Sequence, residues 1–463
     1  MFVLMVVIFV IGYTAIAFEH PIKIDKAASA LLIGVLTWTI FLLGADEILA
    51  GSEHLAKYFK DWLDHNPKES IESIESLRLF IYKHEVGHHL NEIAQILFFL
   101  LGAMTIVELI DAHEGFAVIT DRINTDSRVK LMWILSILTF FFSAALDNLT
   151  TSIVMVALIR KLLKEKEERW FFCGMIILAA NAGGAWSPIG DITTIMLWID
   201  GQVTAGNIIT SIFIPSVVCM VVPLIYLSFT KQGTVVRALG RMDIEHMKNP
   251  TTAFERNLVF FMGVAGLLFV PIFKTVSHLP PFMGMMLSLG VLWVTTEILH
   301  RKKNVEQKSG LSVISVLQKV DVSTVYFFLG ILLAVSSLQS AGHLGILATW
   351  LDRVVGHIYG INVIIGALSA IVDNVPLVAG AMGMYELGPL VQGSAYPVDH
   401  EFWEFLAYCA GTGGSMLIIG SAAGVAVMGM ERIDFIWYLK KISIFEAMGY
   451  LAGAATYILM NPY

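Results

Sequence analysis

The sequence predicts an all-α polytopic membrane protein built from two inverted structural repeats. Three observations carry this prediction. Hydrophobic residues make up 56% of the 463 residues and charged residues only 15%, whereas a soluble domain carries about 25% charged residues. Apolar runs long enough to cross a hydrocarbon core of about 30 Å recur from end to end. An Asp-Asn motif followed by a glycine-interrupted apolar run occurs in each half of the chain.

Ten segments have the length and flanking polarity expected of membrane-spanning helices. They lie at about 2–18, 28–50, 91–111, 170–200, 208–229, 256–275, 282–300, 321–341, 402–431 and 435–460. The first has no basic residues ahead of its apolar stretch, so we expect a span and not a cleaved signal peptide. Cys173, Cys219 and Cys409 lie within apolar segments without paired spacing, which indicates neither a disulfide framework nor a thiolate metal site.

Two further apolar stretches, 130–163 and 361–385, have polar centres and are predicted to be re-entrant hairpins. Asp147–Thr151 interrupts the first stretch, and basic residues flank it at both ends. Ends with the same charge preference favour one side of the membrane. Asp373–Pro376 interrupts the second stretch in the same way. With both hairpins re-entrant, most Lys and Arg residues fall on the cytoplasmic side and both termini are predicted to lie outside.

Each half therefore contains three spans, a hairpin, a glycine-broken span and a final span. Because this is an odd number of crossings, the two halves must be inverted. The predicted boundaries are a first repeat at 1–230 with its broken span at 170–200, a cytoplasmic linker at 231–256, and a second repeat at 257–463 with its broken span at 402–431. Inverted repeats with paired broken helices are typical of secondary transporters, which bind substrate near the membrane midplane.

Asp147 and Asp373 are the first candidates for chemistry, because a carboxylate near the bilayer centre usually marks an ion or proton path. Loss of hydration favours the protonated carboxyl group, whereas a bound cation favours the carboxylate. One buried Asp can therefore hold a proton or a metal cation in competition, which is the simplest basis for cation/proton exchange. The alternative is that each Asp only caps a half-helix by accepting backbone N–H bonds.

Side chains with oxygen atoms accompany the two Asp residues, and a hard cation such as Na⁺ prefers oxygen ligands. The candidates beside the two tips are Ser143, Asn148, Thr150, Thr151, Ser369 and Asn374. Asp191, Thr193 and Thr194 follow the first glycine break, whereas the second break has Ser421 in the position of Asp191. The halves are thus not equivalent, and Asp191 is a second candidate for the proton-exchanging carboxylate. The choice among Asp147, Asp191 and Asp373 stays open.

A third motif, His84-Glu85-x-x-His88, matches the helical pattern of zinc proteases. It lies on the charged lead-in to a span, within a predicted amphipathic interfacial helix, and no soluble domain follows to build a cleft. A membrane zinc metalloprotease is therefore a distant alternative, and no zinc is expected. Clustered histidines can also sense pH. The candidates for a proton path or pH sensing are His88, His89, Glu92 and Glu108.

Four motifs together resemble the NhaD-type sodium/proton antiporters of the ion transporter superfamily. In chain order they read HHLNEIAQILFFLLGAMTIVELIDAHEGF, DNLTT, NAGGAWSPIGDITT and DNVP. The resemblance implies a multi-pass protein of the bacterial inner membrane that exports Na⁺ or Li⁺ in exchange for external H⁺ by an elevator-like movement. It also implies a homodimer. Neither a cofactor nor a nucleic-acid partner is expected.

The resemblance further implies a set of polar functional positions. Carried over by motif, they fall on Ser143, Asp147, Asn148, Asn181, Asp191, Thr193, Thr194, Ser369, Asp373, Asn374, Thr412 and Ser415. This chain has Gln95 where the family usually has a second Glu. The main alternative is a relative in the same superfamily that carries organic anions or arsenite, coupled to Na⁺. An Asp in each hairpin tip, with no Lys or Arg in either polar centre, disfavours a dianionic substrate.

Overall fold

The structure is a computed structural model whose description covers most of the chain. It describes residues 1–17, 19–51, 53–65, 74–120, 123, 125–236, 251–301, 303, 310–371, 373–391 and 395–462. The predicted linker at 231–256 lies largely outside the described residues, as does the start of the predicted interfacial helix. The chain divides into two compact units, and the first comprises Met1–Leu97, Asp321–Ile361 and Val375–Pro397. The second unit comprises Phe98–Val320, Asn362–Asn374 and Val398–Tyr463.

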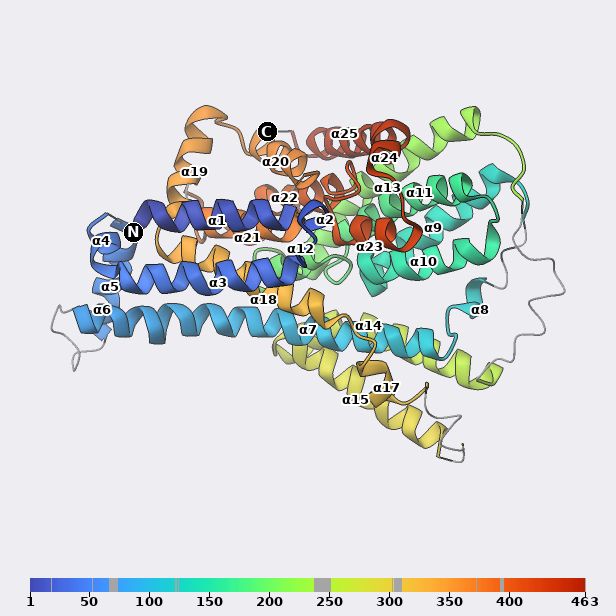
Figure 1. The fold of residues 1–463 in the computed structure, drawn as a ribbon, viewed down its shortest axis with the longest axis horizontal. Coiled ribbons are helices and arrows are strands. Elements are labelled where there is room, and N and C mark those ends of the chain that lie inside the picture. The colour runs from blue at the N-terminus through green and yellow to red at the C-terminus, as the bar shows by residue number, and fades with distance from the viewer. Residues whose placement is uncertain are drawn as a thin grey trace. The chain divides into compact units, whose positions relative to one another are not determined.

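The first unit is built mainly from helices. Its elements are α1 (Phe2–Ala17), α2 (Glu19–Ile22), α3 (Lys26–Leu43), α4 (Ala45–Gly51), α5 (Glu53–His65), α6 (Ile74–Phe80), the π-helix η2 (Ile81–Val86), the first part of α7 (Gly87–Ala112), α18 (Val322–Ser340), α19 (His343–Val354), the start of α20 (Ile358–Ser369), most of α21 (Asn374–Met384), and the short parallel strands β1 (Glu386–Leu387) and β2 (Ala395–Tyr396). In Figure 1, α1 and α3 run side by side, and α3 also packs on α18.

Small residues explain the close approach of α3 and α18. A Cβ atom at Gly34 would lie 2.5 Å from the carbonyl oxygen of Gly330, and one at Gly330 would lie 2.4 Å from the backbone of Ala30. Helices in membranes associate through such small-residue contacts, because lipid supplies no hydrophobic force to bring them together. The same unit contains α6, η2 and the beginning of α7, which belong to one helical stretch from Ile74 to Ala112.

The second unit holds both Asp-Asn pairs and both of the glycine-broken spans that follow them. Besides the later parts of α7 and α20, its elements are α8 (Ala117–Thr120), α9 (Arg128–Leu146), α10 (Asn148–Leu162), α11 (Lys166–Ala185), α12 (Ile192–Ile199), α13 (Ala205–Thr230), α14 (Ala253–Ser277), α15 (Pro281–Leu299), α17 (Val313–Leu317), α22 (Glu401–Gly413), α23 (Ala422–Glu431), α24 (Phe435–Lys441) and α25 (Ser443–Met460). Helices α9 and α10 lie side by side and both pack on α11 (Figure 1).

Eight helical stretches in the described part are long and apolar enough to cross a membrane, or up to nine if the bent pair α19–α20 forms one span. They are Lys26–Leu43, Ile74–Ala112, Arg128–Leu146, Ala205–Thr230, Ala253–Ser277, Pro281–Leu299, Val322–Ser340 and Ser443–Met460. The predicted all-α polytopic membrane fold is thereby confirmed. Helix α9 is long enough to cross by itself, so the re-entrant course of 130–163 stays a prediction, as do the inversion of the repeats and the proposed domain boundaries.

The predicted glycine-broken spans are each divided into two helices. The span predicted at 170–200 consists of α11 and α12, separated by residues 186–191, and the span predicted at 402–431 consists of α22 and α23, separated by residues 414–421. The stretches 130–163 and 361–385 are divided as well, at Asp147 and between Ser369 and Asn374. All four interruptions therefore fall where polar or glycine-rich sequence breaks an apolar run.

Candidate cation site

Asp147 alone separates α9 from α10, and its backbone is strained. Its φ of 87° is unusual for a residue other than glycine and costs about 1–3 kcal/mol. The Asp147 carboxylate accepts hydrogen bonds from the backbone N–H of Thr150 at 2.8 Å and from the Thr150 hydroxyl at 2.7 Å. The capping role considered for this residue is thus present. A carboxylate has about four acceptor sites, so capping leaves Asp147 able to bind a further ligand.

Asp191 is the meeting point of the two Asp-Asn motifs. Its Oδ2 atom accepts a hydrogen bond from Asn148 Nδ2 at 3.0 Å and another from Asn374 Nδ2 at 3.4 Å. Asn148 also donates to Asn181 Oδ1 at 3.0 Å. All four side chains are buried, with at most 3% of their surface exposed. The sequence placed these residues in three separate segments, and the structure brings them into one cluster.

The backbone around Asp191 explains why this carboxylate faces the cluster. Asp191 is the N-cap of α12, where its Oδ1 atom accepts the backbone N–H of Thr193 at 3.1 Å. The hydroxyl of Thr194 donates to the Asp191 carbonyl oxygen at 2.8 Å. One carboxylate oxygen is therefore used by the helix end, and the other is left for the two asparagines. The ideal Cβ position of Gly411 lies only 3.4 Å from Asp191 Oδ2, so glycine leaves space beside this oxygen.

The two halves repeat a set of backbone contacts. Ser143 donates to the carbonyl oxygen of Ala180 at 2.6 Å, and Ser369 donates to that of Ala410 at 2.8 Å. Each serine lies four residues before its Asp. These bonds attach the end of α9 to α11 and the end of α20 to α22, so each Asp-Asn motif is held against the glycine-broken helix of its own half.

The remaining predicted hydroxyl groups have different surroundings. Thr412 donates to the carbonyl oxygen of Tyr408 at 2.6 Å, and Ser415 donates to that of Thr412 at 2.6 Å. Both hydroxyl protons are thus used within or just beyond α22. The hydroxyl group of Thr151 is fully buried, and none of the described residues forms a hydrogen bond with it. Asp373 lies beside Asn374 at the second interruption and also takes part in an interaction of its own.

The predicted proton-path residues form contacts in separate parts of the chain. In the first unit, Glu92 pairs with His88 at 3.0 Å and with His89 at 3.2 Å. His89 also lies 3.1 Å from the hydroxyl group of Ser340, which donates to Glu85 at 2.6 Å. Glu85 and His89 therefore attach the His84-Glu85-x-x-His88 segment to α18. In the second unit, Glu108 lies 4.0 Å from Lys319.

No group of three His, Cys, Asp or Glu side chains in the described part of the chain is arranged to hold a metal ion. A transported Na⁺ would therefore need neutral oxygen ligands in addition to a carboxylate, and the asparagine amides and threonine hydroxyls supply that chemistry.

Two residues of this region were not among the site candidates predicted from the sequence. The Ser421 hydroxyl accepts a hydrogen bond from Asn181 Nδ2 at 3.1 Å, which joins the second broken helix to the cluster. Its alignment with Asp191 was the available signal. Glu446 on α25 is fully buried, and Tyr438 lies within 3.3 Å of its carboxyl group. The signal for Glu446 was a single acidic residue inside the last apolar run.

Comparison with known proteins agrees with this architecture. The family model CitMHS, described as citrate transporter, matches residues 13–403. The chain is 44% identical to sodium/proton antiporter 1 of Arabidopsis thaliana over 99% of its own length and 72% of that protein. It is 42% identical to sodium/proton antiporter 2 of the same plant, over 99% of its length and all of that protein. It is 28% identical to the Na(+)/H(+) antiporter NhaD of Alkalimonas amylolytica, over 98% and 90% of the two chains.

These matches, together with the apolar helices, define a polytopic membrane transporter and not an enzyme. The chain belongs to the CitMHS citrate transporter family. The resemblance to NhaD-type antiporters that the four motifs indicated is confirmed.

Proposed function

We propose that this protein is a sodium/proton antiporter whose exchange site is centred on Asp191. The single observation that carries the proposal is the pair of hydrogen bonds from Asn148 and Asn374 to the same Asp191 oxygen. Those two residues belong to the two Asp-Asn motifs, so one carboxylate is in hydrogen-bonding contact with both motifs. The names of the relatives, which are sodium/proton antiporters, support the same function.

The proposed mechanism follows from the hydrogen-bonding capacity of the cluster. Two amide N–H donors stabilise Asp191 as a carboxylate. When Oδ2 carries a proton, this oxygen becomes a hydrogen-bond donor. One asparagine amide then rotates so that its oxygen accepts the hydrogen bond from Asp191. We propose that Na⁺ or Li⁺ binds the charged form, together with oxygens of Asp147, Thr151 and Asp373, and that a proton displaces it. Competition for one buried carboxyl group makes the two bound states exclusive.

We further propose that the halves are inverted repeats and that the site alternates between membrane faces by an elevator-type movement. The paired serine contacts of Ser143 and Ser369 support the repeats, because each half forms the same bond at the same position relative to its Asp. All of the cluster residues belong to one compact unit, as a moving body requires. The homodimer, the bacterial inner-membrane location and the external termini remain predictions.

The test uses everted membrane vesicles that hold a pH gradient. We expect NaCl or LiCl to collapse the gradient for the wild type and to have little effect for Asp191→Asn, with KCl and citrate as comparison additions. The Ser421→Ala variant serves as a control for expression and insertion, because it changes the aligned position without removing a charge. Collapse by citrate without a response to Na⁺ would contradict the antiport function and favour anion transport instead.

A further inference from the structure

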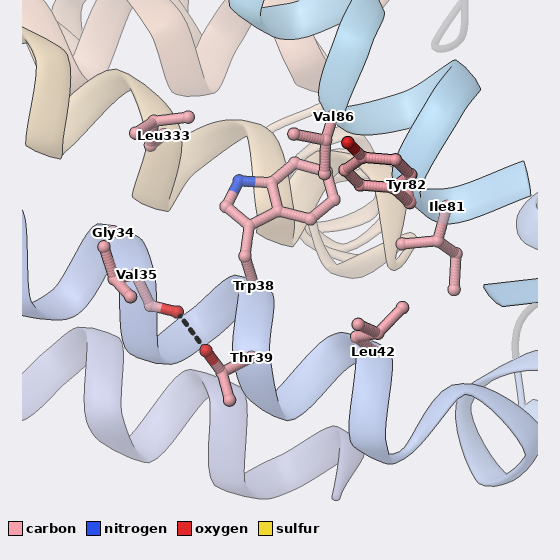
Figure 2. Close-up of a pocket in the computed structure, with 9 residues that line it drawn as sticks. All are labelled: Gly34, Val35, Trp38, Thr39, Leu42, Ile81, Tyr82, Val86 and Leu333. Carbon is pink, nitrogen blue, oxygen red and sulfur yellow. Dashed lines mark hydrogen bonds between the residues drawn. The ribbon is translucent and has the colours of Figure 1, made fainter. Parts of the chain in front are cut away.

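A cavity of about 280 Å³ lies within the first unit, where α3, η2 and α18 meet. Its lining is almost wholly apolar, and no lining residue is a carboxylate or a basic side chain. It is therefore not part of the cation site. Six of the residues that line it are Gly34, Trp38, Leu42, Ile81, Val86 and Leu333. Figure 2 shows the Trp38 indole in the middle of these side chains.

Trp38 leaves a polar group without a partner in this apolar place. Its side chain is only 9% exposed, and none of the described residues accepts a hydrogen bond from its Nε1 atom. A buried indole N–H normally finds an acceptor, since leaving it unmade costs the desolvation of that group. The neighbouring hydroxyl of Thr39 donates to the carbonyl oxygen of Val35 at 2.8 Å (Figure 2) and forms no hydrogen bond with the indole. The cavity thus combines an apolar wall with one unused donor.

The wall opposite α3 has an unusual backbone. Ile81 and Val86 are the first and last residues of η2, and π-helical turns are rare and frequently occur at functional sites. This wall is fastened to α18 because the Ser340 hydroxyl bonds to Glu85 at 2.6 Å and lies 3.1 Å from His89 Nε2. The Gly34–Gly330 contact fixes α3 against α18 on the other side. Polar bonds and backbone contact therefore hold the walls that surround the cavity.

We propose that the cavity binds the acyl chain of a membrane phospholipid, with an ester carbonyl oxygen accepting the hydrogen bond of Trp38 Nε1. The helices around it include candidate spans, so the surrounding solvent is lipid. The apolar lining suits a hydrocarbon chain. The single donor suits one uncharged acceptor, whereas a fatty-acid carboxylate or a phosphate would lack a cation among the lining residues.

The size of the cavity and the neighbours of Trp38 support this ligand. Pockets for drug-sized molecules span about 300–1,000 Å³, so this cavity of about 280 Å³ admits a segment of a chain and not a larger ligand. The Trp38 ring lies 6.2 Å from the ring of His89, and His89 lies 3.1 Å from the hydroxyl group of Ser340, the last residue of α18. Trp38 is therefore level with the end of the α18 span, which is the depth at which lipid ester groups and interfacial tryptophans are found.

The first test asks whether a chain enters the cavity. The full chain is reconstituted in phosphatidylethanolamine and phosphatidylglycerol vesicles with or without bromine on the acyl chains, and the emission of Trp38 is taken as wild type minus Trp38→Phe. We expect brominated chains to quench this emission although the indole is buried. Val86→Phe, which fills the cavity, should reduce the quenching at least twofold, whereas Val10→Phe at an exposed position of α1 should not. Equal quenching in the wild type and Val86→Phe would overturn the proposal.

The second test asks whether the ester carbonyl is recognised, and it uses the wild type itself. Native mass spectrometry after detergent washing compares retention of an ester-linked phospholipid with its ether-linked analogue, which lacks the carbonyl group. We expect the wild type to prefer the ester about two- to tenfold, the effect of one hydrogen bond, and Trp38→Phe to show no preference. Retention of detergent only, or no ester preference in the wild type, would contradict the proposal. Neither test depends on ion transport, so the antiport function stands or falls separately.

Discussion

The two glycine-broken helices have nearly the same backbone and different chemistry. Asp191 begins α12 with φ −146° and ψ 146°, and Ser421 begins α23 with φ −135° and ψ 152°. Each residue caps its helix, and each accepts a hydrogen bond from an asparagine of the cluster. The first break therefore contributes a charge, whereas the second contributes a neutral hydroxyl group. Under the proposed mechanism, the same local structure serves exchange in one half and support in the other.

Glycines produce the likeness between these two breaks. A Cβ atom at Gly183 would lie 2.2 Å from the carbonyl oxygen of Phe140, and one at Gly413 would lie 2.1 Å from that of Gly366. Both positions lie just before a helix interruption, and both press against the helix that precedes an Asp-Asn motif. Only glycine allows this close approach of two backbones. The shared geometry therefore depends on glycine, and the difference between the halves depends on the single side chain that caps the second helix.

The largest expected effect comes from removing the charge at the first break. Asp191→Asn should lower Na⁺-dependent exchange about a hundredfold or more, because an amide neither carries the charge that attracts Na⁺ nor takes up the exchanged proton, and an interaction with a charged group contributes about 1.5–3 kcal/mol. Ser421→Ala should leave most of the exchange intact. The measurement is the initial rate of gradient collapse in everted vesicles at equal protein content. Equal losses in both variants would show that the two breaks contribute alike and would contradict the asymmetry.

The next effect compares the two asparagines that meet at Asp191. Asn148→Ala should raise the KM for Na⁺ about tenfold and Asn374→Ala about threefold, because a hydrogen bond contributes about 0.5–1.5 kcal/mol and the second bond is longer, 3.4 Å against 3.0 Å. The KM is measured from gradient collapse over a range of NaCl concentrations. A larger effect at Asn374 would show that the second Asp-Asn motif dominates cation binding.

Thr151 tests whether an unused hydroxyl group serves the cation. Thr151→Val keeps the shape and removes a buried oxygen that has no hydrogen-bond partner in the described part of the chain. We expect thermal stability in detergent to rise by about 1 kcal/mol, because the variant no longer buries a hydroxyl group without a hydrogen-bond partner. We also expect the KM for Na⁺ to rise about threefold. Ser152→Ala is the matched control, because its hydroxyl is buried and unpartnered in the same helix. A gain in stability without a change in KM would show that Thr151 is not a ligand.

The apolar pattern predicted most of the fold and little of the contacts in the site. The span expected at 208–229 is α13 at Ala205–Thr230, and the span expected at 256–275 is α14 at Ala253–Ser277. Length and hydropathy suffice for such helices, because the bilayer requires continuous internal hydrogen bonding. The pattern missed the first residues of α14. This N-terminus carries a capping box, in which Thr252 and Glu255 bond to each other's backbone. Such a cap is polar and is invisible to a search for apolar length.

The site was predicted as a set of residues and not as an arrangement. Spacing along the chain identified Asp191, Asn148 and Asn374 as oxygen-bearing residues near helix breaks. Their meeting at one oxygen depends on how the first residues of α10 and α21 approach the N-cap of α12, which no local pattern encodes. The π-helix η2 was likewise not predictable. Its Glu85 side chain bonds to Ser340, which lies far away in the sequence, and residue spacing along the chain does not reveal such a contact. Chemistry could be read from residue types, whereas geometry required the tertiary structure.

The smallest expected effect tests the likeness of the halves directly. Ser143 and Ser369 form equivalent bonds to the carbonyl oxygens of Ala180 and Ala410, so Ser143→Ala and Ser369→Ala should each lower thermal stability by about 1 kcal/mol. The double variant tests whether the two bonds act independently, in which case the two losses add. Thermal unfolding of the purified protein in detergent measures all three.

Unequal losses would be as informative as equal ones. A much larger loss at Ser143 would mean that the first Asp-Asn motif is held more tightly than the second, and the correspondence between the halves would then be one of geometry without equal energy. Equal and additive losses would mean that both motifs are fastened alike. In that case the functional asymmetry can be assigned to Asp191 and Ser421, because the supports on the two sides contribute the same stability.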